Sequence, residues 1–302
     1  MIRPADTTVV CFGEVLWDSL PRGLFPGGAP MNVAYHLKQL GLTPLPLTAV
    51  GRDQLGDELL RRMTKWGIST QGICVNSAKP TGMARVILVD GSPKFEIVED
   101  VAWDWIEIPA EVRLELSGAK AVVFGSLAQR SENNCRQLGC VLDVCTSALK
   151  VFDVNLRAPY DSLDLVWALS RRADLIKLSD GELCQLLERK ISPSQFAAGV
   201  QDFVVRTGVS KVCLTAGGAG AGLFLNGEWY WEPAQPVNMR DSVGAGDSFL
   251  AGLLHGLLVR AENPSEVLQR AARLAEFVVT QDGATPDYKL NEVGLPVAPL
   301  SK

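Results

Sequence analysis

The sequence has few histidines and no concentrated run of basic residues, and both shortages narrow the range of functions. Only His36 and His255 are present among 302 residues, which argues against a Cys/His metal site for the seven cysteines. The 29 lysines and arginines are outnumbered by 34 acidic residues and form no basic block. Nucleic acid and anionic membranes are therefore excluded as expected partners. The cysteines are scattered and odd in number, as for free thiols in a reducing cytosol.

Long hydrophobic runs are also missing. The longest, at about 249–259, contains His255 and two glycines and is too short to span a bilayer. The N-terminus lacks the apolar core and cleavage site of a signal peptide. We therefore expect a cytoplasmic protein, whose 47% hydrophobic and 21% charged residues are ordinary for a globular fold.

The sequence does contain a regular alternation of strand and helix patterns without repeats or low-complexity linkers. This order predicts an α/β fold with a mostly parallel central sheet and helices on both faces, formed by residues 1–302 as a single domain. A β-hairpin with an Asn226-Gly227 turn is expected over 222–231. Strands are expected at 8–12, 45–50, 121–125, 151–155, 175–179 and 211–215, and helices at about 31–40, 51–66, 133–149, 245–260 and 264–281.

Residues 81–106 break the alternation. A strand pattern at 81–89 runs into Asp90-Gly91, a hairpin turn signal, and a second strand returns at 94–98. The hairpin is either an active-site lid or a decoration of the sheet edge. Residues 14–18 alternate polar with apolar side chains, which predicts a half-exposed strand.

The segment Asp241–Asp247, followed by an apolar helix, is the most informative stretch. Gly244-Ala245-Gly246 leaves backbone N–H groups unshielded at a helix start, where phosphate or a developing oxyanion binds. A carboxylate at Asp247 conflicts with a bound anion unless it takes a proton from a hydroxyl that attacks phosphorus. The alternative is a helix N-terminus with an acidic residue that the dipole favours. A P-loop is excluded because no Gly-Lys-Ser/Thr is present. A Rossmann dinucleotide-binding fingerprint also fits poorly, because Asp247 stands where the dinucleotide pyrophosphate would lie.

The strand expected at 151–155 carries a second group of polar residues. Asp153, Asn155 and Arg157 are expected to point the same way at its C-terminal end, where open parallel sheets bind ligands. A surface salt bridge is the alternative.

Four motifs in this order resemble the ribokinase-like family of carbohydrate kinases, also called phosphofructokinase-B-like. The match covers about residues 8–285, nearly the whole chain. Within the family the Gly-Gly-Ala-Pro form and the Asp153-Xaa-Asn155-Xaa-Arg157 strand look most like fructokinases. The sequence departs from many relatives at Ser179 and Ala272, where they carry asparagine. The motifs are Gly13-Glu14-Xaa-Leu16-Xaa-Asp18, Pro26-Gly27-Gly28-Ala29-Pro30-Xaa-Asn32-Val33-Ala34, Thr215-Xaa-Gly217-Xaa-Xaa-Gly220, and Asp241–Asp247 with Phe249, Ala251 and Gly252.

The resemblance implies roles for individual residues. Asp247 would be the general base, and the amides of Gly244, Ala245 and Gly246 would stabilise the transferring phosphoryl group. Sugar contacts would come from Asp18, Gly28, Asn32, Asn155 and Arg157. Nucleotide contacts would come from Ser179, Thr215, Gly217 and Gly220. Glu182 would order Mg²⁺ through water, and a monovalent cation such as K⁺ would bind Asp241 and the backbone carbonyls of Val243, Val278, Gln281 and Gly283.

The resemblance thus implies an ATP- and Mg²⁺-dependent sugar kinase, most similar to a fructokinase. Another hydroxyl substrate (2-keto-3-deoxygluconate, ribose or a nucleoside) is an alternative, as is a sugar-binding regulator without catalysis. The lid, formed from about 14–25 and 81–106, is predicted to pair with residues 14–18 and to close over the sugar. The bound sugar itself, or the lid of a second subunit in a homodimer, are the other surfaces that could cover its apolar side chains.

Overall fold

The fold is built on a nine-stranded sheet with strand order β13-β12-β11-β10-β9-β8-β1-β4-β5. The computed structural model describes residues 7–20, 23–89, 92–260, 263–291 and 296–297. All neighbouring strands from β5 to β11 run parallel, and the β12–β13 hairpin extends the sheet antiparallel. The strands are β1 (Thr8–Phe12), β4 (Thr43–Gly51), β5 (Ile73–Asn76), β8 (Ala121–Gly125), β9 (Leu149–Asp153), β10 (Leu175–Ser179), β11 (Lys211–Thr215), β12 (Ala221–Leu225) and β13 (Glu228–Glu232).

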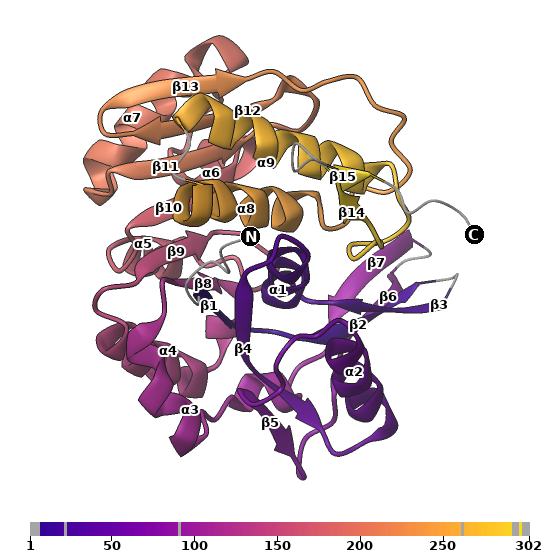
Figure 1. Ribbon diagram of the computed structural model, residues 1–302. Helices are drawn as coiled ribbons and strands as arrows, with labels where there is room; N and C mark the ends of the chain where they lie inside the picture. Colours follow the sequence, from indigo (N-terminus) through magenta and orange to yellow (C-terminus); the bar gives the residue numbers. More distant parts are fainter. Residues whose placement is uncertain (1–6, 21–22, 90–91, 261–262, 292–295, 298–302) are drawn as a thin grey trace.

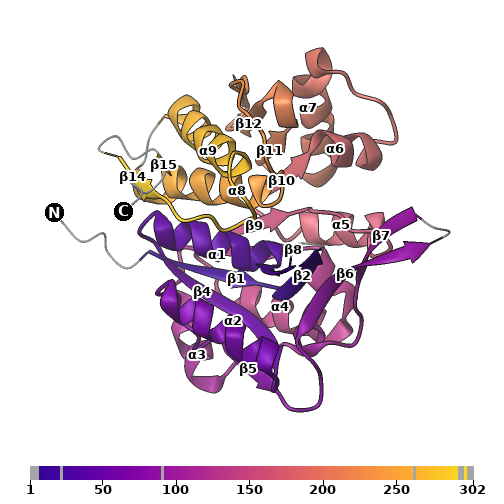
Figure 2. The same ribbon diagram turned by 90° about the vertical axis from the view of Figure 1, so that its right-hand side faces the viewer.

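Helices cover both faces of this sheet, as the alternating pattern predicts. Figure 2 shows α1, α8 and α9 on one side of the sheet and α5, α6 and α7 on the other. Successive residues of β1 enter different cores: Val9 packs with α1, α8 and α9, whereas Val10 packs with α3 to α7. The helices are α1 (Ala29–Gln39), α2 (Gln54–Lys65), α3 (Ala110–Glu115), α4 (Glu132–Val144), α5 (Leu163–Ser170), α6 (Asp180–Leu186), α7 (Phe196–Thr207), α8 (Ala245–His255) and α9 (Pro264–Val279). In the described ranges, no helix has the length and apolarity that crossing a bilayer requires.

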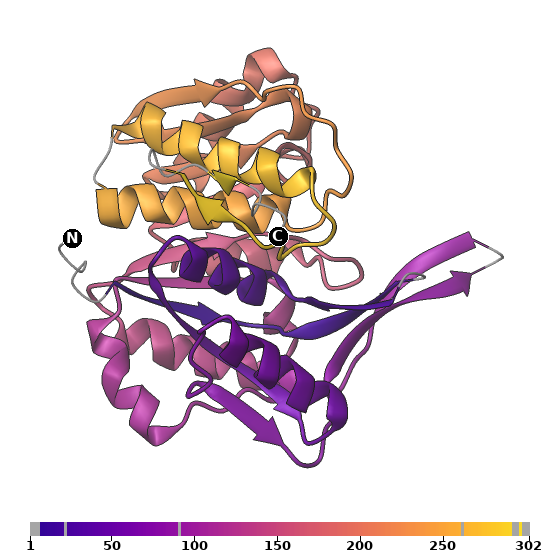
Figure 3. The ribbon, with the colours of Figure 1, turned by 45° about the vertical axis from the view of Figure 1, so that its right-hand side comes forward.

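A smaller four-stranded sheet, the lid, has strand order β3-β2-β6-β7. Its strands are β2 (Leu16–Leu20), β3 (Gly23–Gly27), β6 (Gly82–Val89) and β7 (Ser92–Ile97). β2 pairs in parallel with β6, from Leu16 opposite Gly82 to Ser19 opposite Arg85, so the predicted pairing of the hairpin with residues 14–18 is confirmed. The β6–β7 hairpin projects from the body of the molecule (Figure 3). Its predicted Asp90-Gly91 turn lies outside the described residues.

The prediction of a half-exposed strand at residues 14–18 is wrong. Glu14 is only 3% exposed and Trp17 only 2%. Trp17 packs with residues of α1 and α2, including Tyr35 and Leu59, and its indole N–H donates to the Leu55 carbonyl at 3.0 Å. The polar side chains of Glu14 and Asp18 face an internal cavity instead of the solvent.

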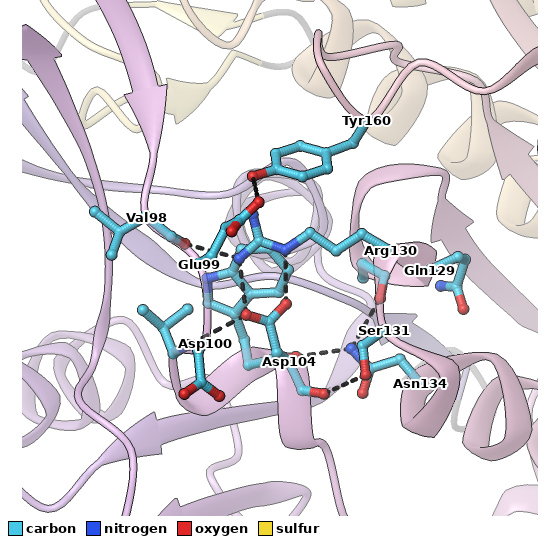
Figure 4. A network of polar contacts seen from close by, with 12 residues as sticks. Val98, Glu99, Asp100, Asp104, Gln129, Arg130, Ser131, Asn134 and Tyr160 are labelled. Carbon is cyan, nitrogen blue, oxygen red and sulfur yellow. Dashed lines mark hydrogen bonds and ion pairs between the residues drawn. The ribbon is translucent and has the colours of Figure 1, made fainter.

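The lid strands lie beside the body of the molecule (Figure 1), and a buried ion pair ties the segment after β7 to it (Figure 4). The Arg130 guanidinium donates to both carboxylate oxygens of Asp104, at 2.7 and 2.8 Å, and to the Val98 carbonyl at 2.7 Å. Its Cζ atom lies 4.0 Å from the Trp103 ring centroid and 4.7 Å from that of Tyr160. These contacts fix the chain directly after β7.

We predict that Arg130→Met lowers the free energy of unfolding by about 3–5 kcal/mol, because it leaves the Asp104 carboxylate buried without its partner. Urea denaturation monitored by circular dichroism measures this loss. Arg172→Met is the matched control, since Arg172 pairs with Asp143 at the surface; exposed pairs contribute about 0–1 kcal/mol. Similar losses for both variants would show that the buried pair does not anchor the lid.

Candidate active site

A cavity of about 420 Å³ lies where the lid meets the N-terminal end of α8. Its walls come from β2, β3, β6 and β7 of the lid, from the start of α1, and from the loops that follow β9 and precede α8. Among the residues singled out in the sequence, eleven line it: Asp18, Gly28, Asn32, Asn155, Arg157, Asp241, Val243, Gly244, Gly246, Asp247 and Gly283. The lining does not include Ala245, Ser179, Glu182, Thr215, Gly217, Gly220, Val278 and Gln281.

Asp247 lies in the first turn of α8 and faces the cavity. Its Oδ2 atom accepts a hydrogen bond of 2.8 Å from the Asn32 side-chain amide, which comes from α1. Burial raises the pKa of Asp247, while the Asn32 hydrogen bond and the positive charges of Lys177 and Arg157 act in the opposite direction. A carboxylate that is desolvated and oriented in this way is a suitable general base.

The glycines around Asp247 are required by close packing. Gly244 has φ +79°, and a Cβ atom there would lie 2.6 Å from the Cβ of Ala284. The Ala245 amide donates to the Ser242 carbonyl at 3.3 Å, so that amide is partly engaged within the protein. The amides of Gly246 and Asp247 also fall in the first helical turn, where N–H groups lack intrahelical acceptors. This turn therefore offers an anion site beside the Asp247 carboxylate.

Two further carboxylates face the same cavity. Glu14, which the sequence analysis does not assign to the site, accepts from the Ala29 amide at 3.2 Å through Oε1. Burial raises its pKa to about 7. Burial likewise raises the pKa of Asp18 to about 6, with Arg157 opposing the shift. Gly28 has φ +103° and packs against the Glu14 backbone so closely that a side chain there would collide with it.

The loop after β9 differs in part from the prediction. The strand ends at Asp153, and Asn155 has φ +39°, so the side-chain alternation expected through Arg157 stops. Asn155 and Arg157 line the cavity, whereas Asp153 is buried and bonded to Lys177. Arg157 is exposed and donates to the Leu156 carbonyl. The three polar residues therefore do not share one face.

Lys177 is a second cavity residue that the sequence analysis does not assign to the site. It lies in β10, directly beside β9, and its Nζ atom is 2.8 Å from Asp153 Oδ1. The sequence does offer one sign of this pair. Lys177 is a charged residue inside an otherwise apolar strand, and Asp153 ends another buried strand.

The residues assigned to the nucleotide are gathered on neighbouring strands at the same edge of the sheet. Ser179 and Thr215 end β10 and β11 and lie opposite each other. Gly217 and Gly220 follow in a tight turn, both with positive φ, and the Ala216 amide donates to the Gly220 carbonyl at 2.8 Å. Strand β10 connects this edge with the cavity, because it ends at Ser179 and also carries Lys177, which lines the cavity.

Glu182 has a structural role in addition to the one expected from the resemblance. Its two carboxylate oxygens accept from the Leu156 and Ser179 amides, each at 2.7 Å. It thereby joins the Asn155–Arg157 loop to the end of β10. A carboxylate oxygen has two lone pairs, so both atoms retain acceptor capacity for a magnesium-bound water.

The residues assigned to a monovalent cation lie in the loop before α8 and at the end of α9 with the loop after it, and these two segments contact each other. Asp241 accepts from the Val243 amide at 3.0 Å and from the Gly283 amide at 3.2 Å. The Val278 carbonyl accepts from the Gln281 amide at 2.9 Å. One carboxylate and several backbone carbonyls are oxygen donors of the kind that hard cations bind.

Comparisons with known proteins match the chain to one family and to several solved structures of similar fold. The model of the pfkB family carbohydrate kinases matches residues 11–290. An uncharacterized sugar kinase from Pyrococcus horikoshii is 30% identical over 250 residues, which are 77% of this chain and 73% of that protein. Its crystal structure superposes with a TM-score of 0.78 at 28% identity and covers 92% of this chain and 93% of its own. Fructokinase-2 of Oryza sativa subsp. japonica is 28% identical over 306 residues, 92% of this chain and 90% of its own. A Xylella fastidiosa fructokinase with bound ATP has a TM-score of 0.79 at 24% identity, covering 93% and 94% of the two chains.

We predict that the stability of Glu14→Gln relative to the wild type is greater at pH 8 than at pH 4.5. Because the pKa of Glu14 rises from 4.5 to about 7 on folding, the folded protein keeps a proton that the unfolded chain loses between these pH values. Stability is therefore lost as pH rises through this window, by about 3 kcal/mol for this group. Glutamine keeps the acceptor for Ala29 and does not ionise.

Differential scanning calorimetry of the variant and the wild type across pH 4.5–8 measures the effect as a growing difference in Tm. Glu115→Gln, at an exposed position of α3, controls for the removal of one negative charge. A difference that stays constant with pH would contradict the raised pKa of Glu14.

Proposed function

The chain belongs to the pfkB family of carbohydrate kinases, and we propose that it is a fructokinase, which transfers the γ-phosphate of ATP to the 6-hydroxyl of fructose. The observation that supports this most is the placement of Asp247, bonded to Asn32, between an anion site and a cavity rich in hydrogen-bond acceptors. Fructokinases among the relatives support the choice of sugar.

The cavity favours a neutral polyhydroxy substrate. Among the residues that the structure describes, three buried acceptor atoms in and beside it have no hydrogen-bond partner: Glu14 Oε2, Asn32 Oδ1 and Asp153 Oδ2. Acceptors of this kind are matched by hydroxyl groups, which donate. The described part of the lining holds four carboxylates, those of Glu14, Asp18, Asp241 and Asp247, but only two cations, Lys177 and Arg157. This excess of negative charge disfavours an acidic sugar. For this reason we place fructose ahead of 2-keto-3-deoxygluconate, whose own carboxylate requires a cation.

Asp247 performs the proton transfer in this proposal. The Asn32 amide holds one carboxylate oxygen, so the other is directed to the sugar hydroxyl, from which it takes the proton as the oxygen attacks the γ-phosphorus. The bond between the γ-phosphorus and the β–γ bridging oxygen breaks, and ADP leaves. Amides at the start of α8, including that of Gly246, stabilise the negative charge on the transferring group.

ATP would lie along the C-terminal ends of β10 and β11. Ser179, Thr215, Gly217 and Gly220 would contact its phosphates, and Glu182 would hold a water on Mg²⁺, which neutralises phosphate charge when bound. K⁺ would bind at Asp241 and the neighbouring carbonyls of Val243, Val278, Gln281 and Gly283. A cation there would fix the loop that precedes α8.

The choice of fructose is tested against the other hydroxyl substrates that kinases of this family could phosphorylate. We expect fructose to give the highest kcat/KM in a coupled ADP-release assay that also contains ribose, adenosine and 2-keto-3-deoxygluconate. A preference for 2-keto-3-deoxygluconate would assign Arg157 to a substrate carboxylate and overturn the choice of sugar. Sugar binding by calorimetry without turnover of any compound would identify a sugar-binding regulator.

We predict that Asp247→Asn lowers kcat by about 10²–10⁴-fold, because the amide keeps the shape of the side chain but cannot accept the proton. Sugar binding, measured by isothermal titration calorimetry, should persist. The matched control is Asp164→Asn on the surface of α5, which should keep full activity. A kcat within threefold of the wild type would exclude Asp247 as the base.

We also predict that the lid responds to the sugar. Ile97 and Ala84 of the lid line the cavity, so a sugar bound there contacts β6 and β7 and closes the site to water. Hydrogen exchange should slow in Gly82–Val89 and Ser92–Ile97 when fructose is added, more than in β8. Equal exchange with and without fructose would contradict a lid function, and protection that depends on protein concentration would reveal lid-mediated dimers instead.

A further inference from the structure

Lys177 is a buried cation that the residue roles assigned above leave unexplained. Its side chain is 8% exposed and its partner Asp153 is 5% exposed. The ammonium group has three N–H donors, and within the described residues its one hydrogen-bond acceptor is Asp153 Oδ1. Lys177 also lines the cavity that contains Asp247.

The position of Lys177 brings its charge to the anion site. A Cβ atom built on Gly246 would lie 3.0 Å from the Lys177 Nζ atom, so the ammonium group packs directly against the first turn of α8. Side chains two residues apart on a strand point to the same side, and Ser179 is two residues after Lys177 in β10. The ammonium group therefore lines the cavity on the same side of β10 as Ser179, one of the residues proposed to hold the nucleotide.

Packing alone does not account for this ion pair. A buried pair loses much of its attraction to desolvation, and apolar residues of similar volume are often as stabilising. The other pair at this depth, Arg130–Asp104, uses three side-chain hydrogen bonds and two aromatic rings to close the base of the lid. Lys177 makes one such bond, and its two remaining N–H donors have no acceptor among the described residues.

We propose that Lys177 is the buried cation of the phosphoryl-transfer site: held by Asp153 against Gly246, it keeps the Asp247 carboxylate ionised and stabilises negative charge at the first turn of α8. The proposal rests on the proposed kinase function. Lys177 acts through Asp247 and the helix turn, so we assign it as a positioning residue.

The charges around Asp247 are mostly negative, so a buried positive charge is needed to favour its ionised form. Negative charge comes from Glu14 and Asp18 on the lid side and from Asp153 at the end of β9. Lys177 and Arg157 are the positive groups that oppose it, and Lys177 is the buried one. Burial disfavours the charge on Lys177, but Asp153, Asp247 and Glu182 more than compensate, and its pKa is raised. On β11 the Cys213 thiol stays neutral, because burial raises its pKa to about 12.

The test compares Asp153→Asn with the double variant Asp153→Asn/Lys177→Met. Both proteins carry asparagine at position 153, so removing Lys177 leaves no buried aspartate without its partner and does not cause misfolding for that reason. The two proteins differ only in the ammonium group, and the comparison measures its effect on Asp247. Carbon-13 NMR of protein labelled at the aspartate carboxyl carbon follows the titration of Asp247 without any substrate. The resonance is assigned by its loss in Asp247→Asn, and circular dichroism verifies the fold.

We expect loss of Lys177 to raise the titration midpoint of Asp247 by about one pH unit or more, as for an opposite charge removed from a carboxylate. The acidic limb of the kcat/KM profile should move to higher pH by the same amount. Lys177→Arg should restore both values at least in part. Arg130→Met, which breaks the other buried pair, should lower stability and leave the midpoint unchanged.

An unchanged Asp247 midpoint in the double variant overturns the proposal, and so does an equal shift in Arg130→Met. Failure of the kinase function gives a different result: the wild type would phosphorylate no compound of the panel, while the substrate-free titration of Asp247 would still report on Lys177.

Discussion

The hydrogen bond from Asn32 to Asp247 joins the two helices on which the cavity depends. α1 also holds the segment after α9: His36 contacts the Ala284 carbonyl at 2.9 Å and the Tyr288 hydroxyl at 3.0 Å, and Tyr35 donates to the Pro286 carbonyl at 2.8 Å. Ala284 in turn packs against Gly244, which precedes the first turn of α8. A single helix thus fixes both the carboxylate and the amides beside it. Because burial lowers the pKa of His36 to about 4, this support stays neutral at physiological pH.

The second constraint is the concentration of carboxylates in a desolvated space. Glu14, Asp18 and Asp247 share one cavity, and burial raises the pKa of each. Such a cavity is unfavourable for the empty protein, since the carboxylates are desolvated and buried acceptors such as Glu14 Oε2 lack a partner among the described residues. In the proposed function, sugar hydroxyls supply the missing donors and the lid excludes the competing water. On that proposal, the polar groups that destabilise the empty cavity are the ones that select a polyhydroxy substrate.

Much of the fold follows from sequence patterns, whereas part of the site does not. Alternating strands and helices predict the parallel sheet, and an unpartnered hairpin at 81–98 predicts its pairing with residues 14–18, because local periodicity and exposed apolar residues carry that information. Glu14 looks like one polar position of a half-exposed strand, and its burial depends on α1 packing over it. Lys177 and Asp153 are 24 residues apart, and only the order of the strands brings them together. The left-handed Asn155 likewise depends on a tertiary contact, the Leu156–Glu182 hydrogen bond beside it.

The central claim is that Asp247 activates the 6-hydroxyl of fructose. A crystal structure of the protein with fructose and a non-hydrolysable ATP analogue tests it most directly. We expect the 6-hydroxyl oxygen within hydrogen-bond distance of Asp247, about 2.6–3.2 Å, and facing the γ-phosphate. A 6-hydroxyl bound to Glu14 or Asp18 instead, with Asp247 contacting no hydroxyl of the sugar, would contradict it.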